Sequence, residues 1–339
     1  MFYNYFSFNW TLIVAFVFNF LLSSLLIKVL ITTLKKHSKF QPIRAEGPET
    51  HFKKAKTPTM GGLAFNISAI ISMLLFCDLN LCYTWIGLFL FVSFSLIGLV
   101  DDIIKVFFND SFGFRGSVKL ILELLVGSIT ILLLAYFDQN YMTSSVKIPL
   151  FNIWLNLGIF GFPFFIMALV GSANATNITD GLDGLLSIPV VIITLLLFSY
   201  VIYSNNFNIE LTKNLANLIL IILLIICSSF LSFFTFNKHP AKVFMGDVGS
   251  LSIGALLFFI AYLLKIELFY AIMGMLFVIE LASSTLQVSF YKIFKKRIFK
   301  MAPIHHHFEK CGISEVNVVR YFWLFSLLMS LVGFILILM

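Results

Sequence analysis

Long apolar stretches separated by short polar segments fill the chain, and each stretch is close to the length that crosses a bilayer. The period-two alternation of a transmembrane β-barrel does not recur. The pattern predicts an all-α, polytopic membrane helical bundle of about ten transmembrane helices, forming a single integral-membrane domain over residues 1–339. The predicted spans are Trp10–Ile31, Gly61–Cys77, Tyr83–Val100, Val118–Phe137, Asn156–Val170, Leu185–Tyr203, Leu215–Phe236, Leu251–Leu264, Leu268–Phe290 and Val318–Met339.

Composition supports this prediction. Hydrophobic residues make up 60% of the chain, charged residues 12%, and the mean hydropathy is +1.00, which excludes an ordinary soluble domain. The first span is too long for a cleaved signal peptide and lacks a small-residue cleavage site. The four cysteines show no CxxC spacing, so they do not indicate a metal site.

The positions of lysine and arginine predict the orientation. Most of them lie in or beside the loops after the first, third, seventh and ninth spans, whereas only Lys147, Lys213 and Lys265 fall on the opposite side. The positive-inside rule therefore makes the lysine-rich side cytoplasmic and places both termini outside. Every polar motif described below then falls on the cytoplasmic face.

A polar segment with the sequence N-A-T-N-I-T-D-G-L-D-G, residues 174–184, lies between two apolar runs. Polar groups this close to membrane depth are costly unless they have a role. Asp180 and Asp183 are three apart where the sixth span is expected to begin, which predicts one shared helical face near a positive helix N-terminus. Asn177 or Thr179 would cap that helix, and capping alone is the simpler alternative.

Further acids end or begin other spans. Asp101 and Asp102 stand in G-L-V-D-D-I-I-K, where adjacent carboxylates would favour a bound Mg²⁺. The alternative is a polar pair at the membrane boundary, with Lys105 as the i, i+4 partner of Asp101. Asp247 stands in F-M-G-D-V-G-S, where glycines allow a phosphate to approach and the carboxylate can hold its metal ion, although a structural turn is equally compatible.

Basic motifs complete the set. His305, His306 and His307 are expected in a loop that presents imidazoles to an anionic substrate or metal-bound phosphate, because three consecutive histidines cannot face one way on a helix. A surface loop without a role is the alternative. Lys53, Lys54 and Lys56 beside T-P-T would grip phosphates or lie at anionic lipid headgroups.

Acids, histidines and lysines on one membrane face suit metal-dependent phosphoryl transfer to or from an anionic substrate. A second class is an ion-coupled transporter, since Glu123 and Glu280 lie inside spans. Transporters usually place their sites near the midplane between inverted repeats, and no such symmetry is evident here. For Glu123 and Glu280, interhelical hydrogen bonding is the simplest expectation.

The motifs T-P-T-M-G-G, G-L-V-D-D, N-x-x-N-x-T-D-G-L-D-G-L, F-M-G-D-V-G-S-L and M-A-P-I-H-H-H-F-E occur in order between the spans. Together they closely resemble the bacterial phospho-N-acetylmuramoyl-pentapeptide transferases. The resemblance implies transfer from UDP-N-acetylmuramoyl-pentapeptide to undecaprenyl phosphate, giving lipid I and UMP for peptidoglycan synthesis. It also implies Mg²⁺, ten spans, a homodimer and the bacterial plasma membrane, with no nucleic-acid partner.

The resemblance also implies roles for individual residues. Asp247 matches the metal-binding aspartate, Asp101 and Asp102 an essential pair of which one acts as base, and His305, His306 and His307 the histidine motif. Substrate-binding positions are matched by Lys54, Thr59, Lys105, Lys119, Asn177, Asp180, Asp183, Asn237 and Phe244. Lys56 departs from the family, which usually has glycine there. A related UDP-N-acetylglucosamine transferase, and a one-step or covalent two-step mechanism, remain open alternatives.

Overall fold

The computed structural model describes residues 8–36, 57–108, 113–137, 145–151, 153–206 and 212–339, and helices dominate this part of the chain. The Lys54 side chain and its neighbouring lysines lie outside the described residues. The helices are α1 (Phe8–Lys36), α2 (Gly61–Phe76), α3 (Cys82–Phe107), α4 (Gly116–Phe137), η4 (Gly158–Phe160), α5 (Gly161–Thr179), α6 (Ser187–Asn206), α7 (Lys213–Asn237), α8 (Asp247–Leu263), α9 (Glu267–Met273), α10 (Met275–Phe294), α11 (Ile304–Lys310) and α12 (Glu315–Leu338).

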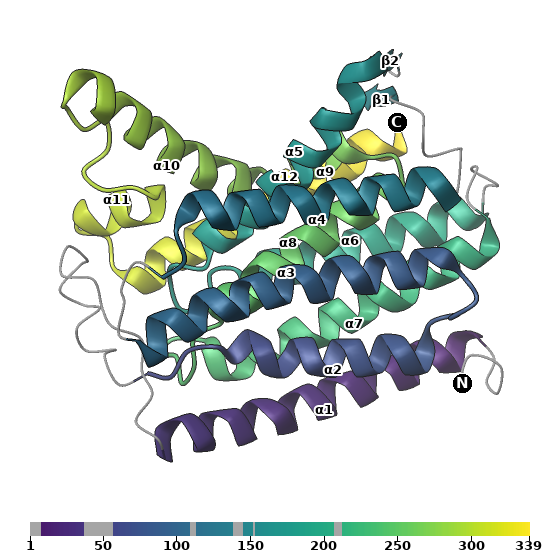
Figure 1. Ribbon diagram of the computed structural model, residues 1–339, viewed down its shortest axis with the longest axis horizontal. Helices are drawn as coiled ribbons and strands as arrows, with labels where there is room; N and C mark the ends of the chain where they lie inside the picture. The colour runs from purple at the N-terminus through teal and green to yellow at the C-terminus, as the bar shows by residue number, and fades with distance from the viewer. Residues whose placement is uncertain (1–7, 37–56, 109–112, 138–144, 152, 207–211) are drawn as a thin grey trace.

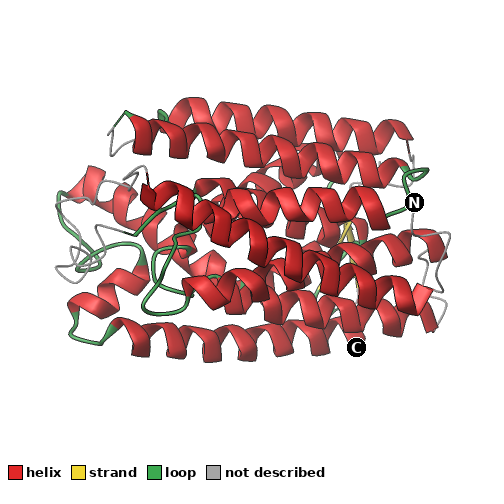
Figure 2. Cartoon of the chain, turned by 90° about the horizontal axis from the view of Figure 1, so that it is seen from below, coloured by secondary structure: helices red, strands yellow, loops and turns green. Residues whose placement is uncertain are grey.

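Seven of the described helices are long and apolar enough to cross a membrane: α1, α3, α4, α5 with η4, α6, α7 and α12. The helices α2 and α8 are apolar but shorter. Most of the long helices run side by side, with their connections gathered at the two ends of the bundle (Figure 2). The all-α, multi-pass prediction is confirmed, whereas the number of spans and the side of each terminus stay predictions.

The predicted ninth span, Leu268–Phe290, is wrong as a single helix. The structure divides it at Gly274 into α9 and α10, whose axes differ by 82°. Glycine is a weak helix former, and the Gly274 N–H bonds back to the Tyr270 carbonyl, which closes α9. The bend directs α10 away from the bundle, so that it projects to one side (Figure 1).

Helix α8 forms the centre of the bundle, and all its residues from Val248 to Leu263 are buried. Small residues allow other helices to approach its first turn. A Cβ atom on Gly98 of α3 would lie 2.3 Å from the Asp247 carbonyl oxygen, and one on Gly62 of α2 would lie 2.4 Å from the backbone of Gly249. Such contacts need glycine, as in closely packed membrane helices. They hold α3 against Asp247, where the site is built.

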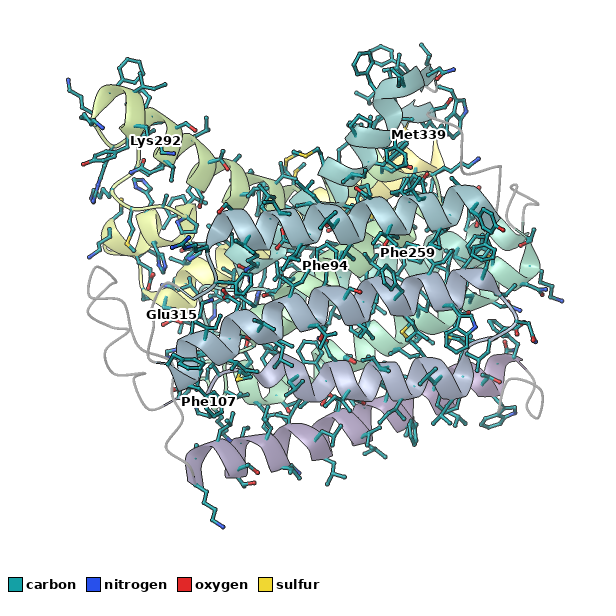
Figure 3. The ribbon with its side chains drawn as sticks, viewed as in Figure 1. Phe94, Phe107, Phe259, Lys292, Glu315 and Met339 are labelled. Atoms are coloured by element: carbon teal, nitrogen blue, oxygen red, sulfur yellow. The ribbon has the colours of Figure 1, made fainter. Side chains whose placement is uncertain are left out.

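The sequence analysis missed a small β-hairpin. Strand β1 (Ser145–Ile148) pairs antiparallel with β2 (Ile153–Asn156), in a register that places Val146 opposite Leu155. Phe107 and Glu315 lie at one end of the bundle, whereas Met339 lies at the other (Figure 3). The hairpin and Met339 are therefore remote from the end that carries the polar motifs.

Candidate active site

A cleft of about 590 Å³ opens among the ends of α3, α4, α5, α8 and α11. Its polar lining groups come from segments far apart in the sequence. We call it the acidic cleft; its lining includes Asp101, Lys105, Lys119, Glu123, Asn174, Asn177, Asp180, Asp247, His305 and His306. The fold thus gathers most of the predicted site residues into one cavity.

Three carboxylates meet at the base of the acidic cleft. Asp101, Asp102 and Asp247 each offer one oxygen, and these oxygens lie within 4.8 Å of one another. Asp102 is buried, and it accepts hydrogen bonds from the backbone N–H groups of Asp247 at 3.1 Å and Val248 at 3.0 Å. This carboxylate therefore holds the positive N-terminus of α8, whereas Asp101 and Asp247 line the cleft itself.

Two lysines balance much of this negative charge. Lys119 Nζ lies 2.6 Å and Lys105 Nζ 3.2 Å from the same oxygen, Oδ2 of Asp247. Lys105 also pairs with Asp101, which confirms the expected i, i+4 ion pair. Asp101 further accepts the N–H of Phe114 at 2.7 Å. Both ammonium groups line the cleft and can turn toward an incoming anion.

The predicted placement of Asp180 and Asp183 at the start of the sixth span is wrong. Asp180 ends α5, Asp183 lies in the following turn, and α6 begins only at Ser187. The polar residues of this segment continue α5 instead of opening α6, because they find partners on α8. The Thr176 hydroxyl donates to the Ser250 carbonyl at 2.8 Å, and the Asn177 carboxamide donates to the Ser250 hydroxyl at 2.9 Å. The proposed caps therefore lie inside α5.

The two acids consequently separate. Asp180 lines the acidic cleft, and burial raises the pKa of its carboxyl well above the usual range, with the charges of Asp247, Asp102 and Asp183 adding to the rise. Asp183 is buried away from the lining and lies 3.1 Å from Nδ1 of His239, which also approaches Glu315 at 3.8 Å. This trio could hold a metal ion by its geometry.

Three further predicted substrate-binding residues do not line the acidic cleft. Asn237 is buried, accepts the Gly184 N–H at 2.9 Å and donates to the Val243 carbonyl at 3.0 Å. Phe244 is half-buried, and its backbone bonds to Pro58 and Gly61. Thr59 is also buried. The Phe244 backbone therefore joins the start of α2 to the segment that leads into α8, whereas Asn237 joins that segment to the turn before α6.

The histidines do not form a loop as predicted, because residues Ile304–Lys310 fold into α11. The helix separates their directions, as expected for consecutive residues. His305 is buried with Nδ1 2.9 Å from Oε2 of Glu280, and its Nε2 has no hydrogen-bond partner within the described part of the chain. His306 pairs with Glu309 at 2.7 Å, whereas Nδ1 of His307 accepts the Lys300 N–H and lies outside the cleft lining.

Glu123 and Glu280 confirm the expectation of interhelical hydrogen bonding. Asn174 of α5 donates to Oε2 of Glu123 on α4 at 2.5 Å, and Glu280 on α10 binds His305 on α11. Glu123 and Asn174 also line the cleft, which was not predicted. Asn174 belongs to the polar segment that the sequence singled out, but the partner on α4 is distant in sequence.

The carboxylate cluster suits a hard divalent ion, because all three candidate ligands are oxygens and the neighbouring ammonium groups already occupy positions that favour positive charge. The fold and the cleft therefore define a class of protein: a polytopic membrane protein whose carboxylates and lysines form a site for a divalent cation and an anionic substrate.

Comparison with known proteins narrows this class. Residues 84–265 match the family model of glycosyl transferase family 4, and residues 54–65 match the phospho-N-acetylmuramoyl-pentapeptide-transferase signature 1. The chain is 45% identical over 330 residues to the phospho-N-acetylmuramoyl-pentapeptide-transferase of Rickettsia felis, which covers 95% of this chain and 90% of the relative. The corresponding proteins of Rickettsia massiliae and Rickettsia prowazekii are 44% identical with the same coverage. The chain belongs to the phospho-N-acetylmuramoyl-pentapeptide transferases.

Proposed function

We propose that this chain transfers phospho-N-acetylmuramoyl-pentapeptide from its UDP derivative to undecaprenyl phosphate, producing lipid I and UMP. The observation that carries this assignment is the cluster of Asp101, Asp102 and Asp247 with Lys105 and Lys119, on a chain that belongs to this transferase family. We further propose that the enzyme is a homodimer in the bacterial plasma membrane, with the acidic cleft on the cytoplasmic face.

The reaction joins two anionic substrates, so the site must reduce their repulsion. An oxygen of the lipid phosphate forms a bond to the sugar-linked phosphorus of the donor. The bond between that phosphorus and the bridging oxygen then breaks, and UMP leaves. Lys105 and Lys119 lie in the cleft at the positions best suited to accept the diphosphate charge.

Asp101 fits the role of base better than Asp102. Asp101 lines the acidic cleft, whereas both oxygens of Asp102 accept backbone N–H groups at the start of α8. A group that accepts a proton from a substrate must come within hydrogen-bond reach of it. We therefore assign Asp102 the task of holding α8, and Asp101 the task of receiving any proton that remains on the lipid phosphate.

The carboxylate of Asp247 would hold Mg²⁺, the cation we propose for this site. When bound, Mg²⁺ supplies charge neutralisation of the donor diphosphate and of the departing UMP. Asp247 is already the acid most closely surrounded by cations, since two ammonium groups contact its Oδ2. Asn177 and Asp180 line the same cleft and would contact the nucleotide part of the donor.

The test is release of UMP from UDP-N-acetylmuramoyl-pentapeptide by the purified protein, with and without undecaprenyl phosphate, and with Mg²⁺ or EDTA. We expect release only when both the lipid and Mg²⁺ are present. If UDP-N-acetylglucosamine is the donor that reacts and UDP-N-acetylmuramoyl-pentapeptide does not, the chain has a related transferase activity instead. Inactivity with both donors would contradict the proposed function and favour the transporter alternative.

A further inference from the structure

A second cavity, of about 600 Å³, lies between the outer part of α10 and the segment that leads into α11. Four of its lining residues are cations and none is an acid: Lys292, Arg297, Lys300 and Lys310. We call it the basic cavity. Lys292 lies on the part of α10 that projects from the bundle (Figure 3). Within the described ranges, no carboxylate lies at ion-pair distance from these four cations.

The basic cavity and the acidic cleft share one segment of chain. Met301 and Ala302 line the basic cavity, whereas Pro303 and His305 line the acidic cleft. The two cavities therefore lie next to each other, on either side of the segment 301–305. A ligand that occupies the acidic cleft needs only a short extension past this segment to reach the four cations.

One face of α10 fixes the shared segment. Gln287 Oε1 accepts the N–H groups of Ile298 and Phe299, each at 3.0 Å, and Ser283 Oγ accepts the Ile304 N–H at 3.0 Å. Glu280 binds His305 further along the same face. The spacing of 280, 283 and 287 places these groups along one side of the helix. The segment that carries Arg297 and Lys300 is thus positioned before any ligand arrives, which lowers the entropic cost of binding.

We propose that the basic cavity binds the peptide carboxylates of the nucleotide-linked donor, while the acidic cleft binds its diphosphate. This inference rests on the proposed function. A peptide joined to the sugar through its amino end has a free C-terminal carboxylate, and a carboxylate matches the planar fork of Arg297 and the ammonium of Lys300. An extended peptide of five residues reaches about 17 Å, enough to pass the shared segment and enter the neighbouring cavity.

The charges of the two cavities favour binding of the diphosphate in the acidic cleft and of the peptide carboxylates in the basic cavity. Four carboxylates, those of Asp101, Glu123, Asp180 and Asp247, line the acidic cleft with only two lysines, so this cleft would repel a bare carboxylate and suits a diphosphate that arrives with a divalent cation. The basic cavity has unbalanced positive charge and is also lined by Tyr291, Val288 and Met301, which can contact peptide side chains. Phosphate headgroups of anionic lipids are the competing occupants, and the test separates them from the peptide.

The experiment compares donors and variants in the purified full-length enzyme. The donors are UDP-N-acetylmuramoyl-pentapeptide, the same compound with its C-terminus amidated, and UDP-N-acetylmuramic acid without peptide. The variants are Arg297→Gln and Lys300→Gln, and the matched control is Lys296→Gln, an exposed lysine of the same segment that does not line the basic cavity. KM and kcat are obtained from initial rates for every combination of enzyme variant and donor. The enzyme is reconstituted in nanodiscs with and without anionic lipid.

We expect each cavity variant to raise KM for the pentapeptide donor about ten- to hundredfold with little change in kcat, the loss expected for one charged hydrogen bond. The variants should have no effect on the peptide-free donor, and amidation should reduce their effect on the pentapeptide. Lys296→Gln should behave as wild type. Equal losses with all three donors, or losses that follow anionic lipid content, would overturn the inference while leaving the proposed function intact. Inactivity of the wild type with every donor would instead refute the proposed function.

Discussion

Nδ1 of His305 lies 2.9 Å from Oε2 of Glu280, and this pair joins the outwardly bent α10 to the wall of the acidic cleft. Both side chains are buried, so the contact is shielded from water. The hydrogen bond orients the imidazole and leaves Nε2 without a partner in the described part of the chain. Glu280 is thus a positioning residue for His305.

We predict that Glu280→Gln lowers kcat about tenfold, because an amide holds the imidazole tautomer less firmly than a carboxylate does. The KM for the donor should stay near its wild-type value, which a general loss of structure would not produce. Thr285→Ala is the control, since its exposed hydroxyl bonds only to the Leu281 carbonyl within α10. An unchanged kcat in Glu280→Gln would contradict this role.

Gly181 lies against the His305 imidazole on the side of Nε2, opposite the contact with Glu280. A Cβ atom there would lie 2.2 Å from Nε2 of His305, too close for the ring to stay in place. Gly181→Ala should therefore lower kcat at least tenfold through displacement of His305. Gly171→Ala is the matched control on α5, because no described atom outside the neighbouring backbone of this helix lies within 4 Å of the added methyl group, and alanine favours the helix. Equal kcat in both variants, measured by UMP release, would show that His305 is not needed at this position.

Asp247 lies at the N-terminus of α8 beneath two lysines. We predict that Asp247→Asn abolishes Mg²⁺-dependent turnover while the protein still folds, because the carboxamide keeps the side-chain size but loses the charge. Turnover is measured across a Mg²⁺ titration, and folding by thermal unfolding in detergent. Full activity at low Mg²⁺ would refute the metal assignment.

The same lysines bear on the choice between direct and covalent routes. Because two ammonium groups neutralise the Asp247 carboxylate, we expect it to be a poor nucleophile. Asp101 is similarly engaged by Lys105 and the Phe114 N–H. Labelled UMP should therefore not exchange into the donor in lipid-free enzyme. Rapid exchange without the lipid acceptor would establish the covalent route instead.

A buried asparagine far from the cleft allows a test of stability alone. Asn19 on α1 donates to Ser228 at 2.7 Å and Ser229 at 2.8 Å on α7, and accepts from Ser68 of α2 at 2.7 Å. Asn19→Ala should lower stability by about 2 kcal/mol, since interhelical hydrogen bonds contribute up to ~1–2 kcal/mol each. We expect a lower Tm with unchanged kcat. A change in kcat with an unchanged Tm would assign Asn19 a role in turnover.

Local residue chemistry was enough to indicate which polar groups belong to the site. The apolar runs located most of the helices, although α5 extends to Thr179 instead of ending at Val170 and the predicted ninth span is divided at Gly274. The carboxylates of Asp101 and Asp247 stood out because charge is rare and costly in such a chain. The i, i+4 pair of Asp101 and Lys105 also followed from helical spacing alone. Motif spacing further allowed the resemblance to the transferase family to be stated.

Only the tertiary structure decided how these groups meet. The break at Gly274, the continuation of α5 to Thr179 and the folding of the histidines into α11 each coincide with a contact from another helix. Ser330 donates to the Met273 carbonyl, Thr176 donates to the Ser250 carbonyl, and Ser283 accepts the Ile304 N–H. The partners of His305, Asn174 and Asp102 come from helices far away in the sequence, so no local pattern could identify them. The sequence by itself determined which chemical groups belong to the site, because rare charged residues and helical spacing are local features. Long-range packing decided their distances, because a contact between two helices depends on the side chains of both.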